Sequence, residues 1–215
     1  MMTSRIKNVD VFVAINTVLF IVKCIITTYP RFIAKYGSEY LTEFFVYAVG
    51  IITLIYILWM VFREYSFDST ILVFLELGIL VHFAGALVTI DGVRLYDSNF
   101  WGIGYDKYVH FVNSFVCAML VRRLFVITRN SINNITSISI LLTVLGLGGI
   151  VEIVEYGVVL TIAHNGVGGY DNNMQDLIAN LCGGLLFLAV CGLQEPCRVL
   201  LEKCRNSYGT LRADE

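Results

Sequence analysis

Residues 136–161 read TSISILLTVLGLGGIVEIVEYGVVLT, a stretch long enough to cross a bilayer that nevertheless carries two acids, Glu152 and Glu155. A transmembrane α-helix needs about 20 consecutive, mainly apolar residues. An ionised side chain at the bilayer centre costs about 2.5–3.5 kcal/mol on the translocon-insertion scale. The stretch therefore predicts a membrane helix whose acids have partners or a function.

The whole chain has the composition of an integral membrane protein. Of its 215 residues, 57% are hydrophobic and 15% are charged, whereas a typical soluble domain has about 25% charged residues. The mean hydropathy is +0.75. With a net charge of −2 and no segment that interleaves basic and aromatic residues, we expect membrane lipid as a partner and no nucleic acid.

Hydropathy over a window of about 19 residues predicts six membrane spans. They cover residues 9–28, 41–62, 69–90, 107–128, 136–161 and 174–194. Pro30 and Pro196 follow the first and the last span, where a proline no longer interrupts a helix. We expect an all-α fold, a polytopic membrane bundle of about six transmembrane helices that forms a single domain over residues 1–215.

The distribution of lysine and arginine predicts that both termini are cytoplasmic. With the N-terminus inside, the inner segments hold ten of these residues: Arg5, Lys7, Arg63, Arg122, Arg123, Arg129, Arg198, Lys203, Arg205 and Arg212. The outer segments hold four: Arg31, Lys35, Arg94 and Lys107. Positive residues concentrate in cytoplasmic loops, so ten against four favours this orientation.

In this orientation, three spans place polar side chains near the outer face. These side chains are Asp106 and His110 at the outer end of the fourth span, Glu152 and Glu155 in the fifth, and Asp176 and Asn180 in the sixth. Within each pair the residues are three or four positions apart, so they share one helix face. We expect these faces to turn away from lipid and to meet at one depth.

Carboxylates exceed cations in this predicted cluster. The acids are Asp106, Glu152, Glu155, Asp171 and Asp176, and the nearby basic candidates are Lys107, His110 and His82. Such an excess binds a cation, shares protons or contacts a positively charged substrate. Carboxylate oxygens with one or two imidazoles suit a divalent zinc, manganese or magnesium ion.

Some of these residues have a structural interpretation as well. Asp106 is a plausible cap of the fourth helix, with Lys107 reaching the headgroups, and Asp171 is a plausible N-cap of the last helix. A lone histidine such as His82 is more often a hydrogen-bonded core residue. The glycine-rich segment 164–171 is predicted to form a flexible lid over the site.

The polar motifs resemble those of a known family. The motifs are Tyr105-Asp106-Lys107-x-x-His110-Phe111, Glu152-x-x-Glu155-Tyr156 and Asp176-Leu177-x-Ala179-Asn180-x-x-Gly183. They resemble the YjdF-type inner-membrane family over about residues 80–190 and are similar, more distantly, to VanZ-like proteins. The resemblance implies a bacterial plasma (inner) membrane, a cell-envelope context and, for some VanZ-like members, tolerance to glycopeptide antibiotics. VanZ-like proteins usually have an arginine before the last motif, and residues 169–175 hold none.

Three functions are compatible with these motifs. The first is a metal-assisted hydrolase or transferase acting on a lipid or lipid-linked substrate in the outer leaflet. The metal ligands would be His110, Glu152, Glu155 and Asp176, the general base Asp106 or Asp171, and Asn180 would orient a ligand or donate to developing negative charge.

The second function is a small transporter coupled to cations or protons, with the acids as a relay. The third is a non-catalytic accessory protein whose polar cluster only holds the bundle together. The inner halves of the last two spans are nearly all apolar, for example at 138–145 and 185–190. A pocket open to one side of the membrane favours the first function over a relay.

Overall fold

The chain is described here from a computed structural model, over residues 6–38, 41–65, 67–161 and 169–211. Within these residues, six helices are long and apolar enough to cross a membrane, which confirms the all-α class and the six spans. They cover Asn8–Tyr36, Phe44–Phe62, Ser69–Leu87, Tyr105–Ile127, Asn134–Gly157 and Tyr170–Gly192. Residues 164–168 of the predicted lid lie outside the described part of the chain.

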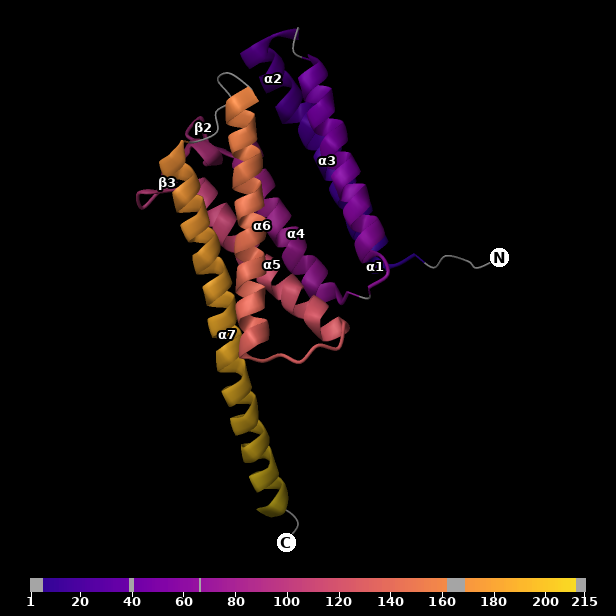
Figure 1. Cartoon of the computed structure of the whole chain (residues 1–215), viewed down its shortest axis with the longest axis vertical. Helices are drawn as coiled ribbons and strands as arrows, with labels where there is room; N and C mark the ends of the chain where they lie inside the picture. The colour runs from indigo at the N-terminus through magenta and orange to yellow at the C-terminus, as the bar shows by residue number, and fades with distance from the viewer. Residues whose placement is uncertain (1–5, 39–40, 66, 162–168, 212–215) are drawn as a thin grey trace, which may run out of the picture. The chain divides into compact units, whose positions relative to one another are not determined.

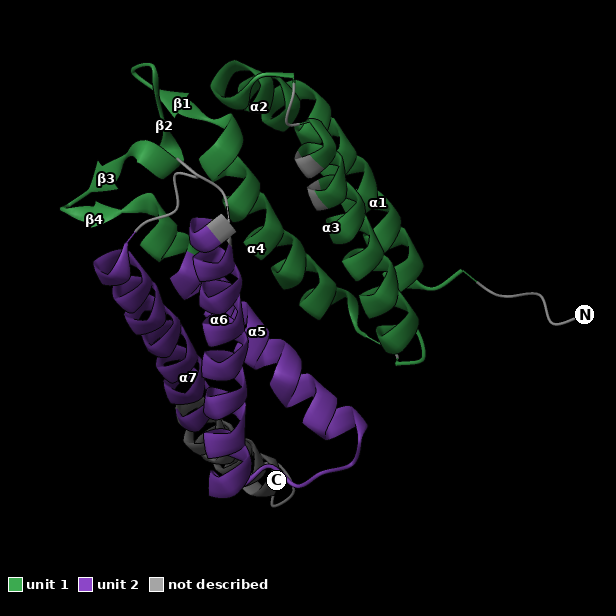
Figure 2. Cartoon of the chain, turned by 45° about the horizontal axis from the view of Figure 1, so that its top comes forward, with its two compact units in different colours: residues 1–109 green, residues 110–215 purple. Residues whose placement is uncertain are grey.

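The helices belong to two compact units, residues 1–109 and 110–215, which are coloured separately in Figure 2; Figure 1 labels the individual elements. The first unit contains α1 (Asn8–Lys23), η1 (Cys24–Thr28), α2 (Tyr29–Tyr36), α3 (Leu41–Phe62) and α4 (Ser69–Leu87). The second contains α6 (Asn134–Thr161), α7 (Tyr170–Leu211) and most of α5 (Tyr105–Ile127), which begins in the first unit. A single domain over the whole chain stays a prediction.

Pro30 lies inside the first span, Asn8–Tyr36, so the expectation that it follows that span is wrong. Pro196 follows the last span, Tyr170–Gly192, as expected, although it lies within the longer helix α7. Pro30 lies in the first turn of α2, directly after the π-helical turn η1. Because α1, η1 and α2 form one continuous helix, the π-helical turn before Pro30 is the local adjustment by which a membrane helix accommodates a proline. The last helix, α7, continues past Pro196 to Leu211. Membrane helices tolerate proline where neighbouring groups satisfy the freed carbonyl.

Two short β-hairpins connect α4 to α5, where the sequence predicted the end of a span. Their strands are β1 (Thr89–Ile90), β2 (Val93–Arg94), β3 (Asn99–Phe100) and β4 (Ile103–Gly104), with the short 3₁₀ helix η3 (Leu95–Asp97) between the hairpins. Each turn has two residues with positive φ: 52° at Asp91 and 80° at Gly92, then 52° at Trp101 and 80° at Gly102. These values define type I′ turns, for which Asp-Gly is a strong signal. The window average concealed that signal beside the apolar residues of the third span.

Polar contacts join the helices of the first unit. Asn16 Nδ2 on α1 donates a hydrogen bond of 2.8 Å to Glu76 Oε2 on α4, which gives a mid-span acid a partner. At one end of α1, Asp10 accepts hydrogen bonds from the Trp59 indole at 2.8 Å and from the Arg63 guanidinium at 2.9 Å. These contacts fix α1 against α3 and α4.

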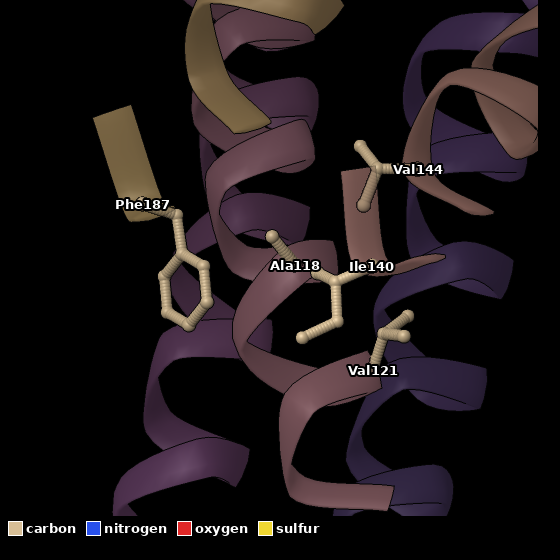
Figure 3. Close-up of a cluster of buried hydrophobic side chains, with 5 residues drawn as sticks. All are labelled: Ala118, Val121, Ile140, Val144 and Phe187. Carbon is tan, nitrogen blue, oxygen red and sulfur yellow. The ribbon is translucent and has the colours of Figure 1, made fainter. Parts of the chain in front are cut away.

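The second unit is a bundle of α5, α6 and α7 around a buried apolar cluster, in which α6 and α7 lie side by side (Figure 1). The cluster, called the apolar seam below, is shown in Figure 3 and consists of Ala118, Val121, Ile140, Val144 and Phe187. By contrast, Ile138, Leu142 and Ile153 on α6 are exposed. Apolar residues on both the inner and the outer face of a helix are typical of a membrane bundle.

Helices α5 and α7 approach each other closely at a glycine. A Cβ atom added at Gly183 would overlap the carbonyl oxygen of Phe111 and lie 3.1 Å from the backbone nitrogen of Phe115. Small residues allow such approaches between membrane helices, where van der Waals packing drives association. The close approach brings the backbones of α5 and α7 together between the apolar seam and the polar end of the bundle.

We expect Gly183→Ala to destabilise the protein by about 1–3 kcal/mol, because the added methyl group meets rigid backbone and forces the helices apart. Gly192→Ala is the matched control on the same helix, since no atom lies within 4 Å of a Cβ added there. It should be neutral, or slightly stabilising from helix propensity. Thermal unfolding in detergent compares the two variants, and equal melting temperatures would contradict the packing argument.

Candidate metal centre

Three potential metal ligands, one from each helix of the second unit, meet at one end of the bundle. His110 Nε2 on α5 lies 3.9 Å from Glu152 Oε1 on α6 and 3.7 Å from Asp176 Oδ1 on α7. Within the described residues these three side chains form a group whose ligand atoms all lie within 4.8 Å of one another. Glu152 is 5% exposed and Asp176 is 1% exposed, so both carboxylates are removed from bulk water.

Helical periodicity places these ligands directly in line with the apolar seam. On α6, Glu152 is preceded at intervals of four residues by Gly148, Val144 and Ile140. On α5 the corresponding series is His110, Ser114, Ala118 and Val121, and on α7 it is Asp176, Asn180, Gly183 and Phe187. Positions three and four apart share a face. Each helix therefore turns one face inward, polar at one end and apolar at the other.

Asn180 lies behind the imidazole and determines which ring nitrogen faces the carboxylates. Its Oδ1 atom is 3.3 Å from His110 Nδ1 and accepts a 2.6 Å hydrogen bond from Ser114 Oγ. An amide oxygen only accepts, so the proton of a neutral imidazole lies on Nδ1. The lone pair on Nε2 then points toward Glu152 and Asp176, as a metal ligand requires.

Asp176, like His110, has a hydrogen-bond partner that orients it. Asn172 Nδ2 donates a 2.7 Å hydrogen bond to Asp176 Oδ2, so the other oxygen, Oδ1, faces His110. Sequence reasoning missed Asn172 and Ser114, although each is four residues from a predicted ligand on the same helix. This spacing of four residues is the signal by which the sequence could have identified both residues.

The spacing of the ligand atoms suits a bound ion better than direct hydrogen bonds. Separations of 3.7 and 3.9 Å exceed those of real hydrogen bonds. Around a tetrahedral zinc ion with bonds of about 2.1 Å, neighbouring ligand atoms are about 3.4 Å apart. The two separations from His110 Nε2 therefore need to shorten by only a few tenths of an ångström to match those around a common ion.

Gly148 creates the space that Asn180 occupies. A Cβ atom added at Gly148 would lie 2.5 Å from Asn180 Nδ2, whereas no atom lies within 4 Å of one added at Gly149. Asn180 is 2% exposed, and its Nδ2 atom has no hydrogen-bond partner within the described part of the chain. Packing against a bare helix backbone thus holds the amide, with its oxygen toward His110.

The remaining predicted site residues have other surroundings. Glu155, one turn beyond Glu152 on α6, is partly exposed and is not a member of the three-residue group. Asp171 is exposed in the first turn of α7. The group therefore contains three of the four residues predicted as metal ligands.

Two predicted polar residues of the first unit have partners there. Asp106 accepts hydrogen bonds from the backbone N–H of Lys107 at 3.0 Å and from its ammonium group at 2.8 Å. Lys107 is buried, so this pair fits the interpretation of Asp106 as a helix-terminal residue. His82 Nδ1 lies 2.6 Å from the hydroxyl of Tyr96, which fits a hydrogen-bonded structural histidine.

The described part of the chain contains six membrane-length helices, three of which enclose a polar cluster, and this defines a multipass membrane protein. The chain belongs to the family described as "Predicted membrane protein (DUF2238)", whose model matches residues 6–195. This membership is consistent with the resemblance to the YjdF-type family. No curated protein and no solved structure matches the chain.

We expect Gly148→Ala to destabilise the protein by about 1–3 kcal/mol, because the new methyl group collides with the Asn180 amide. Gly149→Ala, one residue along α6, should have little effect. In an Asn180→Ala background the cost of Gly148→Ala should largely disappear, since the colliding side chain is absent. Thermal unfolding of the four proteins in this cycle measures the coupling, and purely additive effects would contradict the assignment.

Proposed function

We propose that His110, Glu152 and Asp176 bind a divalent metal ion, and that the protein is a metal-assisted hydrolase or transferase. The observation that carries this proposal is the convergence of one imidazole nitrogen and two carboxylate oxygens within 4.8 Å, from three different helices. A buried pair of acids is costly in an apolar bundle, and a divalent cation offsets two negative charges.

The donor set favours zinc or manganese over magnesium. Magnesium prefers an octahedron of oxygen ligands and keeps several waters, whereas imidazole is a good ligand for zinc. Three protein ligands leave a coordination position open, as catalytic zinc sites do. A bound ion of this kind supplies Lewis acidity toward an ester or phosphoryl oxygen and lowers the pKa of water.

The residues around the ligands have positioning roles in this proposal. Asn180 holds the His110 tautomer and Asn172 orients Asp176, so we assign Asn180 a positioning role in place of direct contact with developing charge. For the general base we retain Asp171, which is exposed and lies in the same unit as the ligands. Asp106 is less suited because Lys107 engages both of its oxygens.

The substrate we propose is a lipid or lipid-linked molecule in the outer leaflet of a bacterial plasma membrane. The orientation rests on the distribution of lysine and arginine, and the envelope context rests on the YjdF-type and VanZ-like resemblance. The polar end of the second unit would then face the headgroups of the outer leaflet. There a lipid ester or phosphoryl group lies at the depth of the ligands.

The apolar seam argues against the transporter alternative for this unit. Ala118, Ile140 and Val144 are 0–1% exposed and close the centre of the bundle immediately beyond Asn180. A proton or cation relay needs polar groups or water across the whole membrane.

In proteoliposomes we therefore expect no metal or proton flux above that of empty vesicles. A flux that Glu152→Gln abolishes would instead favour transport.

The ligand assignment predicts different effects for two neighbouring glutamates. Glu152→Gln should weaken binding of Zn²⁺ or Mn²⁺ by at least about tenfold, because it removes a carboxylate from the ligand group. Glu155→Gln, the same change one helical turn away, should leave the affinity nearly unchanged. Titration of the purified protein against a competing chromophoric chelator measures both affinities.

A wild-type protein that fails to compete with the chelator would contradict the metal proposal, and equal losses in the two variants would contradict the three-residue ligand set.

Metal binding should stabilise the folded protein, which separates this function from a purely structural one. At a free metal concentration of 100 times Kd, binding adds about 2.7 kcal/mol to the free energy of unfolding. We expect saturating Zn²⁺ or Mn²⁺ to raise the melting temperature of the wild type and not that of His110→Ala. If His110→Ala unfolds without metal and the wild type shows no metal-dependent shift, the cluster is structural and the protein an accessory one.

A further inference from the structure

Trp101 occupies a turn position that disfavours bulky residues, and its large apolar side chain is exposed there. Trp101 is the first turn residue of the hairpin formed by β3 and β4, with φ 52°, and it is 94% exposed. Type I′ turns favour asparagine, aspartate and glycine at this position, and positive φ in a bulky residue is a genuine outlier. Neither turn geometry nor packing within the described chain explains a tryptophan there.

The neighbouring hairpin provides an internal comparison. Asp91 occupies the equivalent turn position between β1 and β2, with the same φ of 52° and a following glycine at the same 80°. Aspartate is a favoured residue at this position. The two turns thus have the same backbone geometry, and only the second exposes a large aromatic ring, so its advantage lies outside the chain.

The tethering of this hairpin places its tip close to the membrane boundary. Strand β4 ends at Gly104, and Tyr105 is the first residue of a membrane span. Trp101 and Tyr105 are four positions apart in the sequence, which limits their Cα separation to about 14 Å. The hairpin is held by two hydrogen bonds, from Tyr108 Oη to the Phe100 carbonyl at 3.0 Å and from the Tyr105 N–H to the Ser98 carbonyl at 3.1 Å.

We propose that Trp101 inserts into the interfacial layer of the bilayer and anchors the start of α5 at a set depth. The indole ring would lie at the boundary between the lipid headgroups and the acyl chains. Tryptophan is enriched at that boundary because its ring is apolar and its indole N–H is polar. The exposed side chains of Ile103 (48%), Ile90 (47%) and Val93 (47%) extend the apolar surface of the two hairpins.

An anchor at this position also affects the candidate metal centre through α5. His110 follows Tyr105 by five residues in the same helix. Setting the depth of the first turn therefore sets the depth of a proposed ligand relative to the headgroups. The anchor depends on Trp101 and does not require a bound metal, so a failure of the metal proposal would leave it unaffected.

Fluorescence tests the anchor directly, because Trp59 is the only other tryptophan in the sequence. In Trp59→Phe, all tryptophan emission comes from Trp101. We expect blue-shifted emission in phosphatidylcholine vesicles, strong quenching by lipid brominated on the acyl chain close to the headgroup, and weak quenching by aqueous acrylamide. Emission typical of water, with strong acrylamide quenching and none by brominated lipid, overturns the proposal.

Two controls keep the experiment decisive. Trp59 donates a hydrogen bond to Asp10, so circular dichroism must show wild-type helicity, and Trp59→Tyr replaces Trp59→Phe if that variant misfolds. Trp59 lies near the end of the span Phe44–Phe62 and is itself close to a membrane boundary, so the blank is the double variant Trp59→Phe with Trp101→Phe, which should show no tryptophan signal for bromine to quench. If the double variant retains the quenched signal in full, the quenching in Trp59→Phe does not report on Trp101 and the proposal fails.

Discussion

The absence of water inside the bilayer is the constraint on which the second unit depends. A carboxylate in an apolar helix has no solvent to stabilise it, so it faces other polar groups of the protein. Glu152 and Asp176 accordingly point to one side of the bundle and meet His110. The same constraint leaves the other end of the inner faces to the apolar seam.

Glycine makes this arrangement sterically possible. At Gly183 the backbone of α7 touches the carbonyl of Phe111, and at Gly148 the backbone of α6 receives the Asn180 amide. Any larger residue at either position meets atoms that are already there. The polar end of the bundle therefore depends on two close approaches, one between backbones and one between a backbone and a side chain.

Much of the fold and part of the site followed from local rules. The spans are long apolar runs, so their number and approximate position were predictable, and the spacing of His110, Glu152 and Asp176 indicated inward faces. The hairpins at 89–104 were not predicted, because a window average conceals a two-residue turn signal. The different surroundings of Glu152 and Glu155 were not predicted either. Both lie on similar faces of one helix, and the neighbours of α6 decide which of them lies close to His110.

The sequence by itself determined that this is a six-span membrane protein with polar groups concentrated near one end of its last three helices. Hydropathy and helical period are local properties of the chain, so they need no knowledge of contacts. Only the tertiary structure decided which polar atoms meet: His110 Nε2 with two carboxylates, and Asn180 Oδ1 with His110 Nδ1 and Ser114 Oγ. Those pairings depend on helix rotation and on close approaches at Gly148 and Gly183, which arise only when three separate helices pack together.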